Sequence, residues 1–198
     1  MGDASLFGVY PARVVEVLDP EGLGRVRVRL TTAKVAGVDR AWARFATLMA
    51  GDQSGTWFVP DVDDEVLVAF EGGDPRSPYV VGALWNASAQ PPEAMDAAGA
   101  NPRRVIATRA GARIAIDDDA RSVAVSDSNG NRVLLEPSGI TIQAGSKVSV
   151  EASTAEVTAS SLQVNAGMST FSGMVKCDTL LTNSVIASSY TPGAGNIW

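Results

Sequence analysis

Pairs of apolar residues separated by a single position dominate the second half of this 198-residue chain. Side chains alternate between the two faces of a β-strand, so each pair predicts a short strand with one buried face. The pattern therefore restricts this half of the chain to β-structure. The successive pairs are Ile114/Ile116, Val123/Val125, Val133/Leu135, Ile140/Ile142 and Val148/Val150.

From Ile140 the apolar residues recur at intervals of eight, a period typical of a solenoid or β-helix. Residues 137–198 contain only five charged side chains, so one chain alone would leave the apolar residues in water. Three chains wound together would bury them around a shared axis and leave no long open sheet edge. We therefore predict an intertwined trimeric triangular β-helix, a needle whose trimer core is formed by Ile140, Ile142, Val148, Val150, Val157, Leu162 and Val164.

The first half of the chain carries shorter β-type runs separated by turn residues, with no helical period. Several short strands in fewer than ninety residues predict a small closed barrel. Gly72 and Gly73 predict a tight turn that needs positive φ, and Gly82 predicts a bend at a barrel corner. Trp57 and Phe58 are interpreted as large anchors of the barrel core. The predicted strands are residues 10–19, 25–30, 42–49, 56–60, 65–71 and 79–85.

Composition excludes several classes of function. The net charge of −6 would repel a phosphate backbone, which makes nucleic acid a poor partner. The absence of histidine removes the commonest general base and metal ligand, and Cys177, the only cysteine, has no base to activate it. We predict that the chain is not an enzyme and has no cofactor. We expect synthesis in the cytoplasm without a signal peptide or membrane span.

Two segments of the first half resemble the oligomer-binding (OB) barrel of the phage baseplate assembly protein V family, which is related to the valine-glycine-repeat spikes of type VI secretion. They are FGVYPARVVEVLDPEGLGRVRVRL, residues 7–30, and GTWFVPDVDDEVLVAFEGGDPRSPYVVGALWN, residues 55–86. The resemblance implies an OB-fold barrel that docks on a tail hub protein, and a homotrimer whose needle points at the target cell. Some spikes of this family resemble one another in a histidine-containing iron site, but this chain has no histidine, so no metal is carried over.

The last residues, SSYTPGAGNIW, break the repeat with Pro192 and two glycines and end on Ile197 and Trp198. Three copies of this apolar end would form an adhesive patch, which favours a platform for a tip protein of the PAAR-repeat type. The alternative is a self-capped tip with Trp198 packed on the shaft. The predicted domains are 1–87, the OB-fold barrel; 88–107, a linker; 108–187, the trimeric β-helix shaft; and 188–198, the tip.

Three charged clusters have both a functional and a structural interpretation. The carboxylates 117–119 are interpreted as a solvated turn rather than a calcium loop, and those at 61–65 as a surface loop rather than a glycosidase pair. Arg25, Arg27 and Arg29 lie on one strand face with no aromatic residue between them, which favours acidic partners in the baseplate or between protomers over nucleic acid.

The whole pattern predicts an all-β, non-enzymatic central spike of a contractile phage tail or phage-like injection system, driven through the target envelope by sheath contraction. The alternatives are a trimeric tail-fibre adhesin and an OB-fold protein that binds single-stranded nucleic acid. We expect the spike to contact the target envelope transiently and to belong to a virion baseplate or an assembled injection particle.

Overall fold

The computed structural model of the chain describes residues 5–31 and 39–189. The chain divides into two compact units, Met1–Val148 and Ser149–Trp198, each described here by itself. Strands dominate the first unit, and the 3₁₀ turn η1 (Glu71–Gly73) is the only helical element within the described ranges. The all-β prediction is therefore confirmed for the part of the chain that the structure describes.

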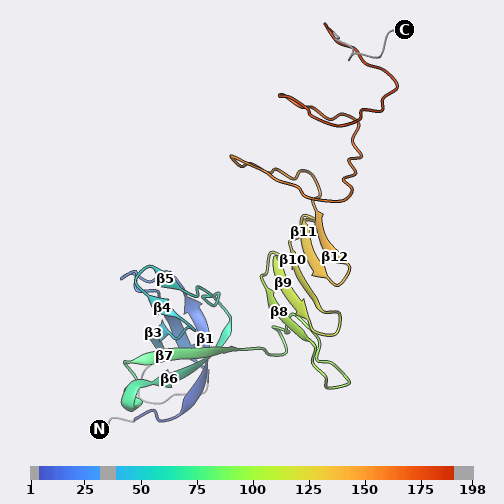
Figure 1. The fold of residues 1–198 in the computed structure, drawn as a ribbon. Coiled ribbons are helices and arrows are strands. Elements are labelled where there is room, and N and C mark those ends of the chain that lie inside the picture. The colour runs from blue at the N-terminus through green and yellow to red at the C-terminus, as the bar shows by residue number, and fades with distance from the viewer. Residues whose placement is uncertain (1–4, 32–38, 190–198) are drawn as a thin grey trace. The chain divides into compact units, whose positions relative to one another are not determined.

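Five strands close into a barrel in the order β1-β2-β3-β7-β6 (Figure 1). Neighbouring strands are antiparallel except β3 and β7, which run parallel. The predicted small closed barrel is confirmed. The strands are β1 (Val9–Glu16), β2 (Val26–Leu30), β3 (Arg40–Phe45), β6 (Glu65–Phe70) and β7 (Pro78–Leu84), with a small hairpin of β4 (Ala50–Gly51) and β5 (Ser54–Gly55) between β3 and β6.

The barrel interior is filled by the inward members of alternating strand residues. Valines dominate this core, and their branched side chains suit a pleated surface. Among the residues that the structure describes, all buried apolar side chains lie between Leu6 and Val80, in the part of the chain that forms the barrel. The core consists of Leu6, Ala12, Val14, Val26, Val28, Ala43, Val66, Val68, Phe70 and Val80.

Glycines permit two local features of the barrel, both confirming the sequence predictions. Gly72 and Gly73 have φ of 57° and 83°, and a Cβ on Gly73 would lie 3.1 Å from the Phe7 ring. Leu67 pairs with Gly82 whereas Val68 pairs with Val80, so a register shift bends the sheet at Gly82.

The predicted strand at 56–60 is wrong. After β5 the chain leaves the small hairpin, and only Thr56 remains tied to it, by donating its N–H to the Met49 carbonyl at 3.0 Å. The sequence interpretation of Trp57 and Phe58 as core anchors is also wrong, since their exposed fractions are 77% and 62%. The narrow barrel is already filled by valines, so two large aromatic rings have no room inside.

A second sheet follows the barrel, with five antiparallel strands in the order β12-β11-β10-β9-β8. Four of them coincide with the first four predicted apolar pairs, which confirms those strands. β8 is not among the strands that the pairs predict, because its sequence RRVIA lacks apolar alternation. The bounds are β8 (Arg103–Ala107), β9 (Arg113–Asp117), β10 (Ser122–Ser126), β11 (Arg132–Glu136) and β12 (Gly139–Gln143).

The described part of the second unit, residues 149–189, contains no strand or helix in the single chain, and all of it is exposed. It has no intrachain ladder with which to satisfy its backbone hydrogen-bonding groups. A single copy therefore does not fold this segment into a β-helix.

Candidate functional site

One face of the β8–β12 sheet carries an uncovered apolar surface built from two cross-strand rows. The register aligns Ile116, Val123, Leu135 and Ile140 in the first row. The second row consists of Ile106, Ile114, Val125, Val133 and Ile142. These nine side chains, called the apolar face below, have exposed fractions between 37% and 70%. An apolar surface of this extent on a soluble chain marks an interaction site.

The opposite face of the same sheet is more polar and better covered. Its middle row includes the small residues Ala115 and Ala124, which are half-buried. Glu93, from the segment before β8, forms ion pairs there with Arg103, at 3.4 Å, and with Arg113. The chain therefore covers its own polar face and leaves the apolar face open.

The predicted trimer-core residues divide into two groups. Ile140 and Ile142 lie on β12 within the apolar face, and Val148 joins Val125, Val133 and Ile142 in lining a shallow pocket of about 490 Å³. Val150, Val157, Leu162 and Val164 belong to the strandless segment and are exposed. The predicted trimer core stays a prediction, and the uncovered apolar surface extends beyond it to Ile106 and Ile114. The alternation of the pairs Ile114/Ile116, Val123/Val125 and Val133/Leu135 was the signal in the sequence that could have predicted this larger surface.

Pro192, Ile197 and Trp198, the predicted partner-binding residues of the tip, lie outside the described residues. Cys177 is exposed in the single chain. Within the described ranges, no group of three or more His, Cys, Asp or Glu residues is arranged to hold a metal ion. No helix in the same ranges has the length and apolar character needed to cross a membrane.

The arginines before and along β2 have carboxylate partners inside the barrel itself. Arg25 forms an ion pair of 2.7 Å with Asp19 and another of 3.0 Å with Glu21, while Arg27 pairs with Glu16 at 3.1 Å. The Asp19 side chain is only 5% exposed and also accepts three backbone N–H bonds. Its guanidinium partner and these donors hold the pKa of Asp19 well below its usual range.

No aromatic residue lies between these arginines along β2, but one accompanies them from the neighbouring strand. Trp42 on β3 lies opposite Arg27, and the guanidinium carbons of Arg25 and Arg27 lie 5.8 and 6.0 Å from its ring centroid. Sequence reasoning considered only neighbours along one strand, whereas this contact crosses between strands. Arg25 and Arg27 pair with acids of the same chain, and the acidic partners expected in the baseplate or between protomers stay a prediction.

The two acidic clusters form turns, as the sequence predicts. In the first, Asp61 and Asp64 both pair with Arg109, at 3.1 and 2.5 Å. In the second, Asp117 ends β9 and accepts the Ala120 N–H at 2.9 Å. Both sets of carboxylates are therefore used in turn and ion-pair contacts.

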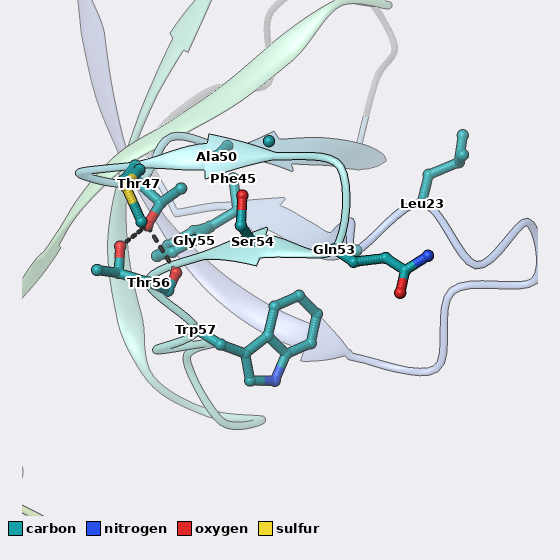
Figure 2. A pocket seen from close by; sticks show the side chains of 12 residues that line it. Leu23, Phe45, Thr47, Ala50, Gln53, Ser54, Gly55, Thr56 and Trp57 are labelled. Atoms are coloured by element: carbon teal, nitrogen blue, oxygen red, sulfur yellow. Dashed lines mark hydrogen bonds between the residues drawn. The ribbon is translucent and has the colours of Figure 1, made fainter.

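A second candidate surface lies at the β4–β5 hairpin, where a pocket of about 480 Å³ opens beside Trp57 (Figure 2). Leu23 and Gly24, from the loop that Asp19 organises, line one side, and the hairpin lines another. Thr47 donates to the Thr56 carbonyl at 2.8 Å and also contacts the Thr56 hydroxyl, as the dashed lines in Figure 2 show. This cavity is called the Trp57 pocket below.

Comparison with known proteins finds two family matches, one over the barrel and one that begins at β8 and continues into the second unit. The "Type VI secretion system/phage-baseplate injector OB domain" matches residues 10–85. The "Phage baseplate V C-terminal trimerisation domain" matches residues 103–169. The type VI secretion system spike protein VgrG3 of Vibrio cholerae serotype O1 is 30% identical over 92 residues, with 41% of this chain and 9% of that protein covered. This chain therefore matches only a small part of that relative's length.

Proposed function

Because this chain belongs to the phage baseplate protein V and VgrG spike family, we propose that it is the structural central spike of a contractile phage tail or phage-like injection system. The chain assembles as a homotrimer within the tail baseplate or injection particle. The match of residues 103–169 to a trimerisation domain supports this assembly. Sheath contraction drives the trimer through the target envelope, and the action is mechanical rather than enzymatic.

The apolar face of the β8–β12 sheet is the observation that carries the proposal. Nine aliphatic side chains lie in two cross-strand rows, and no other described residue of the first unit covers them. At about 1.5–3 kcal/mol for each fully buried aliphatic side chain, a shared core of three such faces would gain tens of kcal/mol. Two further copies of the chain are the natural cover, because each copy carries the same unmatched face.

The needle continues this core beyond β12. Val148, Val150, Val157, Leu162 and Val164 point to the trimer axis, and residues 149–189 obtain from neighbouring chains the backbone hydrogen bonds that they lack alone. An intertwined triangular β-helix satisfies both requirements. The proposed domains are 1–87 for the barrel, 88–102 for the linker, 103–187 for the shaft and 188–198 for the tip. The linker ends earlier than the sequence predicts, because β8 already belongs to the sheet.

The two ends of the spike have different partners in this proposal. The barrel docks on the tail hub protein at the end of the tail tube. The tip, with Pro192, Ile197 and Trp198, supports a PAAR-type protein that sharpens the needle. Neither end requires a metal ion or a cofactor.

The proposal is tested by placing a charge on the predicted needle axis. Val150→Asp brings three carboxylates together at the axis, and we expect loss of the trimer, since each uncompensated buried charge costs about 3–5 kcal/mol. Light scattering on the purified chain measures the mass, and particles assembled with the variant are assayed for envelope permeabilisation of target cells. The native chain should scatter as three copies of 20.5 kDa.

Ser149→Asp is the matched control, because it adds the same charge one position away, on the outward side of the strand. We expect this variant to remain trimeric and active. A monomeric native chain, or a trimeric Val150→Asp variant that still permeabilises cells, would refute the needle.

A further inference from the structure

We propose that the Trp57 pocket and the arginines beside it bind an acidic segment of another baseplate protein, one that presents an apolar side chain between carboxylates. The inference rests on the proposed function, in which the barrel joins a neighbour in the particle, and it names the surface and the chemistry of that neighbour. The apolar side chain enters the Trp57 pocket, and the carboxylates meet Arg29 and Arg44.

The Trp57 pocket is apolar, exposed and held in shape by its surroundings. Trp57, Leu23 and Met49 line it and are all more than half exposed. Figure 2 shows the Trp57 indole beneath the β5 strand and the Leu23 side chain beyond Gln53. A Cβ on Gly24 would lie 3.4 Å from the indole, so the loop that Asp19 organises already contacts this ring. Binding in a preformed pocket avoids the entropic cost of ordering it.

Arginines without carboxylate partners continue this surface across the outside of the barrel. The register places Arg29 on β2 directly opposite both Arg13 on β1 and Arg40 on β3. Like charges in facing positions destabilise a sheet. Within the described residues Arg29 and Arg44 form no ion pair with a carboxylate. The guanidinium carbon of Arg44 lies 5.5 Å from the ring centroid of Tyr79, and Glu71 lines the same pocket. An acidic partner would relieve the repulsion in this row.

The apolar and cationic parts of the surface are continuous. Leu23 lines the Trp57 pocket and also a neighbouring pocket that contains Arg25, Trp42, Arg44 and Tyr79. Aromatic and arginine side chains are the residues that contribute most to protein interfaces. One short segment that places an apolar residue beside carboxylates would reach both parts.

The chemistry of the surface favours a protein segment over single-stranded nucleic acid. Nucleic acid needs exposed aromatic faces for base stacking, but arginines already lie over the rings of Trp42 and Tyr79. Asp19, Glu21 and Glu16 already pair with Arg25 and Arg27, so no continuous row of unpaired arginines is left for a phosphate backbone. The two unpaired arginines suit a small number of discrete carboxylates.

The test uses the full-length trimer and fluorescently labelled ten-residue peptides. Each peptide has a central leucine flanked by glutamate, serine or lysine, and anisotropy reports binding. We expect the glutamate peptide to bind at least about tenfold more tightly than the lysine peptide, because rim charges select the partner. Trp57→Ala should lower the affinity for the glutamate peptide about tenfold or more. Arg44→Glu should reverse the preference, so that the lysine peptide binds best.

Trp85→Ala and Arg121→Glu are the controls, since they remove an exposed tryptophan and reverse an arginine elsewhere. Both should bind the glutamate peptide as the native chain does. Equal binding of the three peptides, or binding that Trp57→Ala leaves unchanged, would overturn the proposal. If an oligothymidylate binds more tightly than the glutamate peptide, and Arg44→Glu abolishes that binding, the surface would be assigned to nucleic acid instead.

Light scattering separates this proposal from the proposed function. A Trp57→Ala or Arg44→Glu chain that falls to a monomer would show that a second copy covers the surface, and would overturn the partner assigned here. A stable trimer that binds none of the peptides would overturn the docking surface and leave the spike intact. The proposed function is tested separately by Val150→Asp, because Val150 lies outside the barrel. A trimeric Val150→Asp variant that still permeabilises cells would refute the needle, whatever the peptides bind.

Discussion

Two aspartates organise loops of this protein in the same way, by accepting several hydrogen bonds from the turn that follows them. Asp19 does so before β2, and Asp127 closes the β10–β11 hairpin. Asp127 accepts the backbone N–H groups of Asn129 and Asn131 at 2.8 and 3.0 Å and is also bonded by both of their side-chain amides. These donors, Asn131 first, lower the pKa of Asp127 to about 2.

Asp127→Ala should destabilise the hairpin in a pH-dependent manner. The carboxylate has a lower pKa in the folded than in the unfolded chain, where it is about 3.9. Its contribution is therefore fully present above about pH 4–5 and is lost as the pH falls towards 2. The melting temperatures of the native chain and Asp127→Ala should be measured between pH 7 and pH 2. We expect the difference between them to be constant down to about pH 4–5 and to shrink below that pH.

Asp127→Asn distinguishes the contribution of the negative charge from that of the acceptor oxygens. This variant keeps one acceptor for the turn, so we expect a smaller loss at pH 7 than Asp127→Ala causes. A difference between native and Asp127→Ala chains that stays constant down to pH 2 would contradict the assignment.

Alternation assigns opposite properties to neighbouring residues of the central strand β10. Val125 belongs to the apolar face, while Ser126 points to the other side and lies between Arg113 and Arg132 in the register. The same substitution at these two adjacent positions therefore meets either the apolar face, which we propose is buried in the trimer, or two guanidinium groups. A β-sheet provides this contrast because its side-chain period is two.

Val125→Asp should abolish the trimer, at a cost on the order of 3–5 kcal/mol for each uncompensated charge. Ser126→Asp should be neutral or stabilising, since opposite charges in facing strand positions contribute about 0.2–1 kcal/mol. Sedimentation over a range of chain concentrations measures both. Equal trimer stability in the two variants would show that the apolar face is not the interface.

The apolar pairs predicted β9 to β12 from the sequence because alternation is a local signal that needs no knowledge of neighbours. β8 was missed, as Arg103 and Arg104 precede Val105 and Ile106 without alternation. Trp57 was misplaced for another reason: a large aromatic residue in a strand-like run resembles a core anchor, and the space inside a barrel is set by all strands together. The Trp42 contacts were missed because they depend on register between strands.

The molecule concentrates its buried side chains in one region. All buried apolar residues among the described ones lie between Leu6 and Val80, and the β8–β12 sheet and residues 149–189 have none. The barrel therefore has its own core, whereas the remainder depends on other copies. A two-state description does not apply to such a chain.

We expect unfolding in two steps. The transition of the C-terminal half should move to lower temperature when the chain is diluted, because its stability depends on association. The barrel transition should keep the same midpoint at every concentration. Circular dichroism and calorimetry over a hundredfold dilution series measure both. A single transition, or one with no concentration dependence, would contradict this division.

The uncovered apolar face also determines when this chain is most vulnerable. A newly made copy has its own barrel core, but it must meet two others before its C-terminal half is protected. Until then the aliphatic rows and the unpaired edges of β8 and β12 can attach to any exposed strand, which is the ordinary beginning of aggregation. Assembly needs three copies, so its rate falls steeply as they become scarce. Productive spikes are therefore favoured where copies are made close together in time and place, as on a single messenger RNA read by several ribosomes.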